Sequence, residues 1–244
     1  DYYEGVSTKS FVVERDDINK LEYIQVNSFD NKDGRELQRY LANTTYDKIV
    51  IDLRDNYGGV ISYAKDYIFP ELYSEDARMQ FDWKVPNTDS NKKMTDRPGV
   101  NLLYFEDKDE DYYYYSESLS FDGRATEDKE VYYLVGPGTG SAADKYIAMI
   151  KENGLGTIVG MNTGGEGRGA SYICDRLKES SLVYVYYPSE SINEDAICGT
   201  APDVYVNQRA EDYALYEKMR IEGTASLYES RVQYDTVLKW VIEQ

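Results

Sequence analysis

Three short apolar runs, each followed by a glycine-containing turn, constrain the fold of this chain more than any other feature. They are KIVIDL at 48–53, EVYYLV at 130–135 and TIV at 157–159. Runs of this length without polar alternation are typical of strands buried on both faces of a parallel sheet. Segments with helical spacing follow the first two runs, at about 61–67 and 142–152. Strand, glycine turn and helix in that order predict an α/β fold of mostly parallel strands with flanking helices.

Weaker patterns complete the predicted core. They are alternating or apolar segments that favour strands at 21–29, 181–187 and 204–206, and helices at 35–41 and 234–242. The strands at 181–187 and 204–206 are expected to be the fourth and fifth buried strands. Asp33 stands in the turn before the helix at 35–41 and is a candidate N-cap, because aspartate oxygens accept from free helix amides.

The segment 71–129 differs in character from the rest. It is polar, it alternates weakly, and it contains an acidic run at 106–111 followed by tyrosines at 112–115. This pattern predicts an inserted antiparallel hairpin with a solvated charged loop. A segment that covers substrate is the alternative. We therefore expect one core domain over 1–244 that carries an insertion at about 71–129.

The charge balance excludes two classes of partner. The chain has 244 residues and a formal net charge of −18. Such a field repels phosphate backbones and anionic headgroups, so nucleic acid and membrane surfaces are not expected as ligands. No apolar run approaches the roughly 20 residues that span a bilayer. The chain begins at Asp1 in a polar stretch without an initiator methionine, and we expect that an N-terminal part of the full protein is missing.

Histidine is absent, and there are two cysteines. Without histidine, these residues alone form neither a His-based metal site nor a Ser-His-Asp triad, and we predict no metal and no cofactor. Cys174 and Cys198 match no zinc or redox spacing. A disulfide in an exported protein and two separate buried thiols both remain open.

Two glycine turns carry the candidate chemistry. The run GPGTG places Ser141 at the start of a helix, where free amides and the helix dipole favour negative charge. Ser141 is either an N-cap or a nucleophile whose own turn supplies an oxyanion-hole amide. Gly58 and Gly59 are either an ordinary tight turn or a place where backbone amides approach a substrate carbonyl.

The order of the motifs favours the catalytic alternatives. Along the chain stand YIQVNSF, IVIDLRDNYGG, VYYLVGPGTGSAAD, NGLGTIVGMNTGGEG and GTAPDVYV, within about 21–207. This order resembles the C-terminal processing (tail-specific) serine peptidase family. Its members show a D-L-R-x-N-x-G-G turn, an S-A-S-A-x-E segment, an N-G-x-A-x-x-V-G strand, a T-x-G-x-G turn and a late G-x-x-P-D. Each motif alone is weak, and together in this order they are specific.

The resemblance implies a ClpP/crotonase-like core, a polypeptide substrate and an extracellular or cell-envelope location, and it leaves the oligomeric state open. Ser141 falls on the family nucleophile, and Asp144 falls on an acidic position of the same helix. Gly58, Gly59 and the amide of Ala142 fall where the family builds its oxyanion hole.

One position departs from the Ser-Lys branch of the family, because Glu166 stands where that branch has its lysine. A glutamate is a far weaker base than a desolvated lysine amine at neutral pH. Three explanations follow: a histidine ahead of Asp1, as in the tricorn-core-like branch; a non-catalytic relative that binds a peptide or an apolar ligand; or catalysis at acidic pH with Glu166 as base. In the first case an acidic residue such as Glu194 or Asp195 would orient the imidazole, and the alternative for both is a solvated loop.

Overall fold

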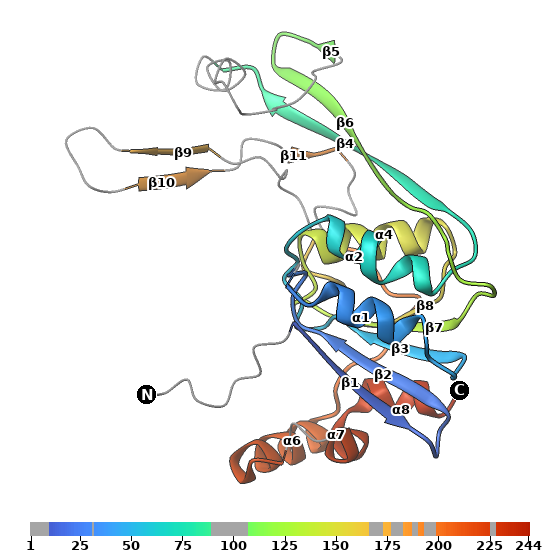
Figure 1. The fold of residues 1–244 in the computed structure, drawn as a ribbon. Coiled ribbons are helices and arrows are strands. Elements are labelled where there is room, and N and C mark those ends of the chain that lie inside the picture. The colour runs from blue at the N-terminus through green and yellow to red at the C-terminus, as the bar shows by residue number, and fades with distance from the viewer. Residues whose placement is uncertain are drawn as a thin grey trace.

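The fold is built on one six-stranded sheet, seen in a computed structural model of the chain (Figure 1). The structure describes residues 10–30, 32–88, 107–165, 173–176, 183–186, 190–192, 199–224 and 228–244. The sheet has the order β1-β2-β3-β7-β8-β12. Its strands are β1 (Phe11–Asp16), β2 (Leu21–Val26), β3 (Lys48–Asp52), β7 (Glu130–Val135), β8 (Thr157–Gly160) and β12 (Val204–Tyr205). Neighbouring strands are parallel except β1, which pairs with β2 in the antiparallel direction. The α/β fold with a mostly parallel core is therefore confirmed.

Helices cover both faces of this sheet (Figure 1). One face carries α1 (Gly34–Leu41), α2 (Ser62–Tyr67) and α4 (Ala142–Glu152). The other face carries α7 (Tyr228–Tyr234) and α8 (Thr236–Ile242), and α6 (Ala210–Glu222) precedes them. The result is a helix–sheet–helix arrangement of three layers.

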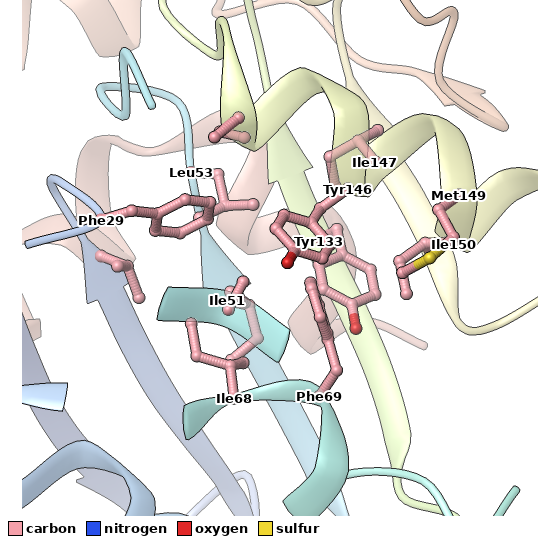
Figure 2. Close-up of a cluster of buried hydrophobic side chains, with 14 of the residues drawn as sticks. Phe29, Ile51, Leu53, Ile68, Phe69, Tyr133, Tyr146, Ile147, Met149 and Ile150 are labelled. Atoms are coloured by element: carbon pink, nitrogen blue, oxygen red, sulfur yellow. The ribbon is translucent and has the colours of Figure 1, made fainter. Parts of the chain in front are cut away.

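Alternation along the strands explains the two apolar interfaces. Ile49 and Ile51 of β3 lie in the core beneath α1, α2 and α4, and Val50 between them lies in the core beneath α7 and α8. Successive side chains of a strand point to opposite faces, so a strand buried on both sides must be apolar throughout. Figure 2 shows the larger interface, where Tyr146 and Ile150 of α4 pack against Tyr133 of β7.

The described residues of the segment 71–129 form a long antiparallel ribbon that projects from the body (Figure 1). Its main strands are β4 (Ala77–Pro86) and β6 (Tyr112–Phe121), with β5 (Asp107–Lys108) and β11 (Glu190–Ser191) at its two edges. The short 3-10 helix η1 (Phe69–Glu71) leads into it. The expected antiparallel pairing is present, and it runs in register from Ala77↔Phe121 to Pro86↔Tyr112.

Three local predictions need correction. The segment 181–187 contains β10 (Val183–Tyr186), which pairs with β9 (Ile173–Arg176) in a separate two-stranded sheet and does not belong to the six-stranded sheet of the described residues. Asp33 occupies the N-cap position of α1, but its side chain makes no cap bond and accepts instead from the amide of Ser10. The strand predicted at 21–29 ends at Val26, although Phe29 makes an isolated parallel bridge to Gly59.

Candidate active site

The two glycine turns predicted to carry chemistry meet at one edge of the sheet. Both follow neighbouring parallel strands, β3 and β7, so both lie at the carboxyl edge. A Cβ atom placed on Gly58 would lie 2.7 Å from the Ser141 Cβ and 2.8 Å from the Ala142 nitrogen. No side chain fits in that space, and Gly58 also has a φ of +97°, which favours glycine. The close approach of the bend to Ser141 therefore depends on glycine.

Ser141 has an unusual backbone conformation. Its φ is +52° and its ψ is −126°, and it is one of two non-glycine residues with positive φ in the described part of the chain. Its side chain makes no cap hydrogen bond to α4, and the residue is exposed. A strained backbone of this kind is typical of functional positions, because ordinary packing gives no reason to retain it. Ser141 occupies the N-cap position of α4, but its hydroxyl does not cap the helix, so the N-cap interpretation of this side chain is wrong.

Buried polar residues join the two turns. The Thr139 hydroxyl donates to the Leu53 carbonyl at 2.8 Å, and the Gly140 amide donates to the Asn56 carbonyl at 3.0 Å. Asn56 is fully buried, and its side-chain amide donates to the Val26 carbonyl at the end of β2 at 3.0 Å. These bonds fix the ends of three strands relative to one another. Sequence reasoning did not assign Asn56 a role, although it is the asparagine of the DLRDNYGG motif.

The free amides around Ser141 define what the site can stabilise. The Gly58 amide is already used, because it donates to the Asn56 Oδ1 at 2.8 Å. The bridge to Phe29 uses the Gly58 carbonyl and the Val60 amide, which leaves the Gly59 amide pointing away from Phe29. Within the described ranges, the amides of Gly59 and Ala142 donate to no acceptor of the chain. The Ala142 amide directly follows the exposed Ser141, and the Gly59 amide belongs to the bend whose Gly58 lies against Ser141, so both are candidate donors to an oxyanion.

Asp144 lies one step along the same helix but is buried, with 1% of its surface exposed. Its Oδ1 accepts from the hydroxyls of Thr163 and Thr200, the latter at 2.9 Å, and the Thr200 amide lies at 3.3 Å. These partners come from the TGGEG turn and from the GTAPD segment. Asp144 therefore holds both segments against the first turn of α4.

Ion pairs fix the first residues of the loop that follows β3 and carries Gly58 and Gly59. Arg54 donates to Asp52 and also to Asp235, the N-cap residue of α8, with bonds of 2.9 Å from Nε to Asp52 Oδ1 and from Nη1 to Asp235 Oδ1. Burial of Asp52 acts to raise its pKa, but the charge and hydrogen bonds of Arg54 outweigh burial, and the pKa lies below its ordinary value. Burial likewise acts to lower the pKa of Arg54, and the two carboxylates raise it well above the ordinary value. Asp52 and Arg54 therefore both stay charged at neutral pH.

Some predicted site residues lie outside the described residues, namely Glu166, Glu194, Asp195 and Cys198. The choice of base and the pairing of Cys174 therefore stay predictions. Among the described side chains, no group of three His, Cys, Asp or Glu residues is arranged to hold a metal ion. The described helices include none that is long and apolar enough to cross a bilayer.

A family of known proteins matches most of the chain. Residues 20–206 match the sequence profile described as Peptidase family S41. No curated protein sequence matches the chain.

Solved structures share the fold at low sequence identity. The photosystem II D1 C-terminal processing protease is 17% identical with a TM-score of 0.54, and the match covers 83% of this chain and 49% of that one. A protein of Parabacteroides merdae is 16% identical with a TM-score of 0.61, covering 95% and 67% of the two chains. Mature CPAF is 13% identical with a TM-score of 0.55, covering 93% and 55%. The chain thus spans about half the length of the D1 processing protease.

Proposed function

Because the chain belongs to peptidase family S41, we propose that it is the catalytic core of a serine endopeptidase of the C-terminal processing type. The observation that carries the proposal is the approach of the Gly58 bend to Ser141, an exposed residue whose hydroxyl does not cap its own helix. The substrate is a polypeptide, as the family implies.

In the proposed reaction, the Ser141 Oγ attacks the carbonyl carbon of the scissile peptide bond while a base takes the hydroxyl proton. The carbonyl oxygen becomes an oxyanion that accepts hydrogen bonds from the amides of Gly59 and Ala142. The C–N bond then breaks, and the proton passes to the leaving amine. Water later attacks the acyl-enzyme, releases the acid product and restores the hydroxyl. Because Gly58 has no side chain, it leaves room for the substrate carbonyl to reach these amides.

The base is proposed to be a histidine from outside residues 1–244. The chain has no histidine, and Glu166 stands at the lysine position of the Ser-Lys branch. Asp144 does not fit the role of base, because its carboxylate is buried and already accepts from Thr163 and Thr200. The chain of residues 1–244 alone is therefore expected to be inactive at pH 7.

A non-catalytic role is the second candidate, and the missing base favours it. On that account the same site holds an extended peptide or an apolar ligand without turnover. Binding would then survive Ser141→Ala unchanged.

Hydrolysis of an unfolded polypeptide by the full-length protein separates the two candidates. The peptidase proposal expects cleavage by the wild-type protein and a loss of about 10⁴-fold or more in Ser141→Ala, as for nucleophile removal in other serine peptidases. A wild-type protein that binds the polypeptide and never cleaves it, at neutral or acidic pH, would support the binding role instead.

A further inference from the structure

A pocket lies on the face of the sheet that carries α7 and α8. It has a volume of about 270 Å³, and it is enclosed by the loop after β3, by α6 and α7, and by the residue that precedes α8. Two arginines and three tyrosines are among its lining residues, namely Arg54, Arg231, Tyr213, Tyr216 and Tyr234. Ser141 does not line it, so this concave surface is separate from the candidate nucleophile.

The three tyrosines form a continuous aromatic wall on α6 and α7, which lie side by side (Figure 1). The ring centroids of Tyr216 and Tyr234 are 5.0 Å apart, and those of Tyr213 and Tyr216 are 6.4 Å apart. Tyr234 is 5% exposed and Tyr213 is 57% exposed, so the wall runs from the interior to the surface. Such a wall suits an apolar or aromatic group, which would cover the exposed ring of Tyr213.

Arg231 contributes hydrogen-bond donors that the chain leaves unused. Its Nη1 donates to the Tyr23 hydroxyl at 2.8 Å, and its Nη2 donates to the Gln25 Oε1 at 2.6 Å. A guanidinium has five N–H groups. The others on Arg231 donate to no acceptor within the part of the chain that the structure describes, although only 21% of the side chain is exposed. Partly buried donors without an acceptor favour a ligand rich in acceptor oxygens.

The charge of Arg231 is also less well compensated than that of Arg54. Arg54 donates to both oxygens of Asp52 and to both oxygens of Asp235. Arg231 lies 3.9 Å from Asp52, and its hydrogen-bond partners are both neutral. Hydrogen bonds from a guanidinium to an anion are stronger than those to neutral groups, so an anion is the ligand that matches the unused N–H groups best.

The rim and the size of the pocket narrow the class of anion. Asp55 also lines the pocket and is exposed, and its charge disfavours a doubly charged phosphate more than a singly charged carboxylate. The two guanidinium groups of the wall disfavour a cation. The volume of about 270 Å³ lies just below the roughly 300–1,000 Å³ of sites for drug-sized ligands, so the pocket fits a group about the size of one amino-acid residue.

We propose that this pocket binds a carboxylate carried on an apolar or aromatic group of about one residue in size. The carboxylate accepts from the unused N–H groups of Arg231, and the apolar group packs against Tyr213 and Tyr216. Two sources share this chemistry: a small organic acid, and the last residue of a polypeptide, whose terminal carboxylate is free. Binding here does not depend on Ser141 acting as a nucleophile.

Calorimetric titration of the full-length Ser141→Ala protein tests the site, because this variant lacks the candidate nucleophile and leaves the probe intact. The probes are N-acetyl-L-phenylalanine and N-acetyl-L-phenylalaninamide, which differ only in the carboxylate. We expect saturable binding of the acid with a Kd on the order of 1 mM, as for a ligand of this size, and binding at least about tenfold weaker for the amide. Equal affinity for the two probes, or no binding of the acid, would overturn the proposal.

Substitutions assign the binding to this pocket. Arg231→Gln removes the guanidinium and should weaken binding of the acid at least about tenfold. Because Arg231 also holds Tyr23 and Gln25, Tyr213→Ala is the second variant; its ring is largely exposed, and affinity should fall on the order of threefold with the fold retained. Tyr205→Ala is the matched control, since Tyr205 is 66% exposed and does not line the pocket. Unchanged affinity in Tyr213→Ala, or in a folded Arg231→Gln protein, would overturn the proposal.

A second pair of probes separates the two sources. A short glycine–serine peptide that ends in phenylalanine with a free carboxylate is compared with the same peptide amidated. A peptide acid that binds at least as tightly as N-acetyl-L-phenylalanine identifies the last residue of a polypeptide as the ligand. Binding of the single-residue acid without binding of the peptide acid identifies a small organic acid. Both results support a carboxylate site, whereas an amidated peptide that binds as tightly as the peptide acid overturns it.

Discussion

The loop that follows β3 has two halves with opposite chemistry. In the first half, Arg54 spends its donors on Asp52 and Asp235 and ties the loop to α8. In the second half, the Gly59 amide donates to nothing within the described chain, and the neighbouring Gly58 lies against the exposed Ser141. The paired half supplies rigidity, and the unpaired half supplies groups for a ligand. A preorganised site needs both, because donors are useful to a transition state only if they are held still before it arrives.

The largest expected effect comes from removing the Arg54 guanidinium, which holds the first half of the loop. Arg54→Met leaves Asp235 buried without Arg54 and leaves Asp52 with Arg231, 3.9 Å away, and loss of one partner of a buried pair costs about 3–5 kcal/mol. Urea unfolding of the two proteins measures this loss. Lys32→Met is the control, because its ion pair with Asp30 is exposed and the expected change is below about 0.5 kcal/mol. Equal stability of Arg54→Met and wild type would show that the ion pairs do not hold this loop.

The next largest effect comes from adding a side chain at Gly58, in the second half of the loop. Gly58→Ala places a methyl group against the backbone at Ser141 and at a positive φ, so fluorophosphonate labelling of Ser141 should slow by about a hundredfold, near 2.7 kcal/mol. Gly140→Ala is the matched control, because nothing lies within 4 Å of its added Cβ. Similar labelling rates in the two variants would contradict the close approach.

A smaller effect is expected one helical step away, at Asp144. Asp144→Ala leaves the hydroxyls of Thr163 and Thr200 without their acceptor and should cost about 1–3 kcal/mol. Asp144→Asn keeps an acceptor oxygen, so its free energy of unfolding should fall clearly less than that of Asp144→Ala. Urea unfolding measures both. A carboxylate that acted as the base would show the reverse selectivity, with full stability and no turnover in Asp144→Asn.

The smallest expected effect is a loss of folding stability at acidic pH, which comes from carboxylates whose pKa is lowered by their partners. The pKa of Asp52 is lowered, and the pKa of Asp212, which accepts from Thr236 and Lys239 of α8, is lowered to about 2 against burial. A carboxylate with a folded pKa below its unfolded value stabilises the fold above the unfolded pKa and loses that contribution as pH falls through the folded pKa. The free energy of unfolding should therefore fall between about pH 4 and pH 2, and less steeply in Asp212→Asn. A flat profile over that interval would contradict the assignment.

The parts of the structure that sequence predicts are those fixed by local patterns. The apolar runs predicted β3 and β7, and GPGTG followed by Ser141 predicted the start of α4. β10 was assigned to the core because VYVY is as apolar as a buried strand, and nothing local says which strands are neighbours.

The contacts that decide the site join distant segments. Arg54 and Asp235 are 181 residues apart, and Lys145 meets Glu117 across an insertion. A sequence pattern shows that a charged residue is present, and only the topology shows that its partner is buried beside it. For the same reason the role of Asn56 at three strand ends was not predicted.

Fluorophosphonate labelling of the full-length protein, followed by peptide mass spectrometry, tests the central claim most directly. The account predicts an adduct on Ser141 that disappears in Ser141→Ala, which keeps the wild-type fold. A folded protein that carries no adduct on Ser141, or carries it on another serine, would contradict the account.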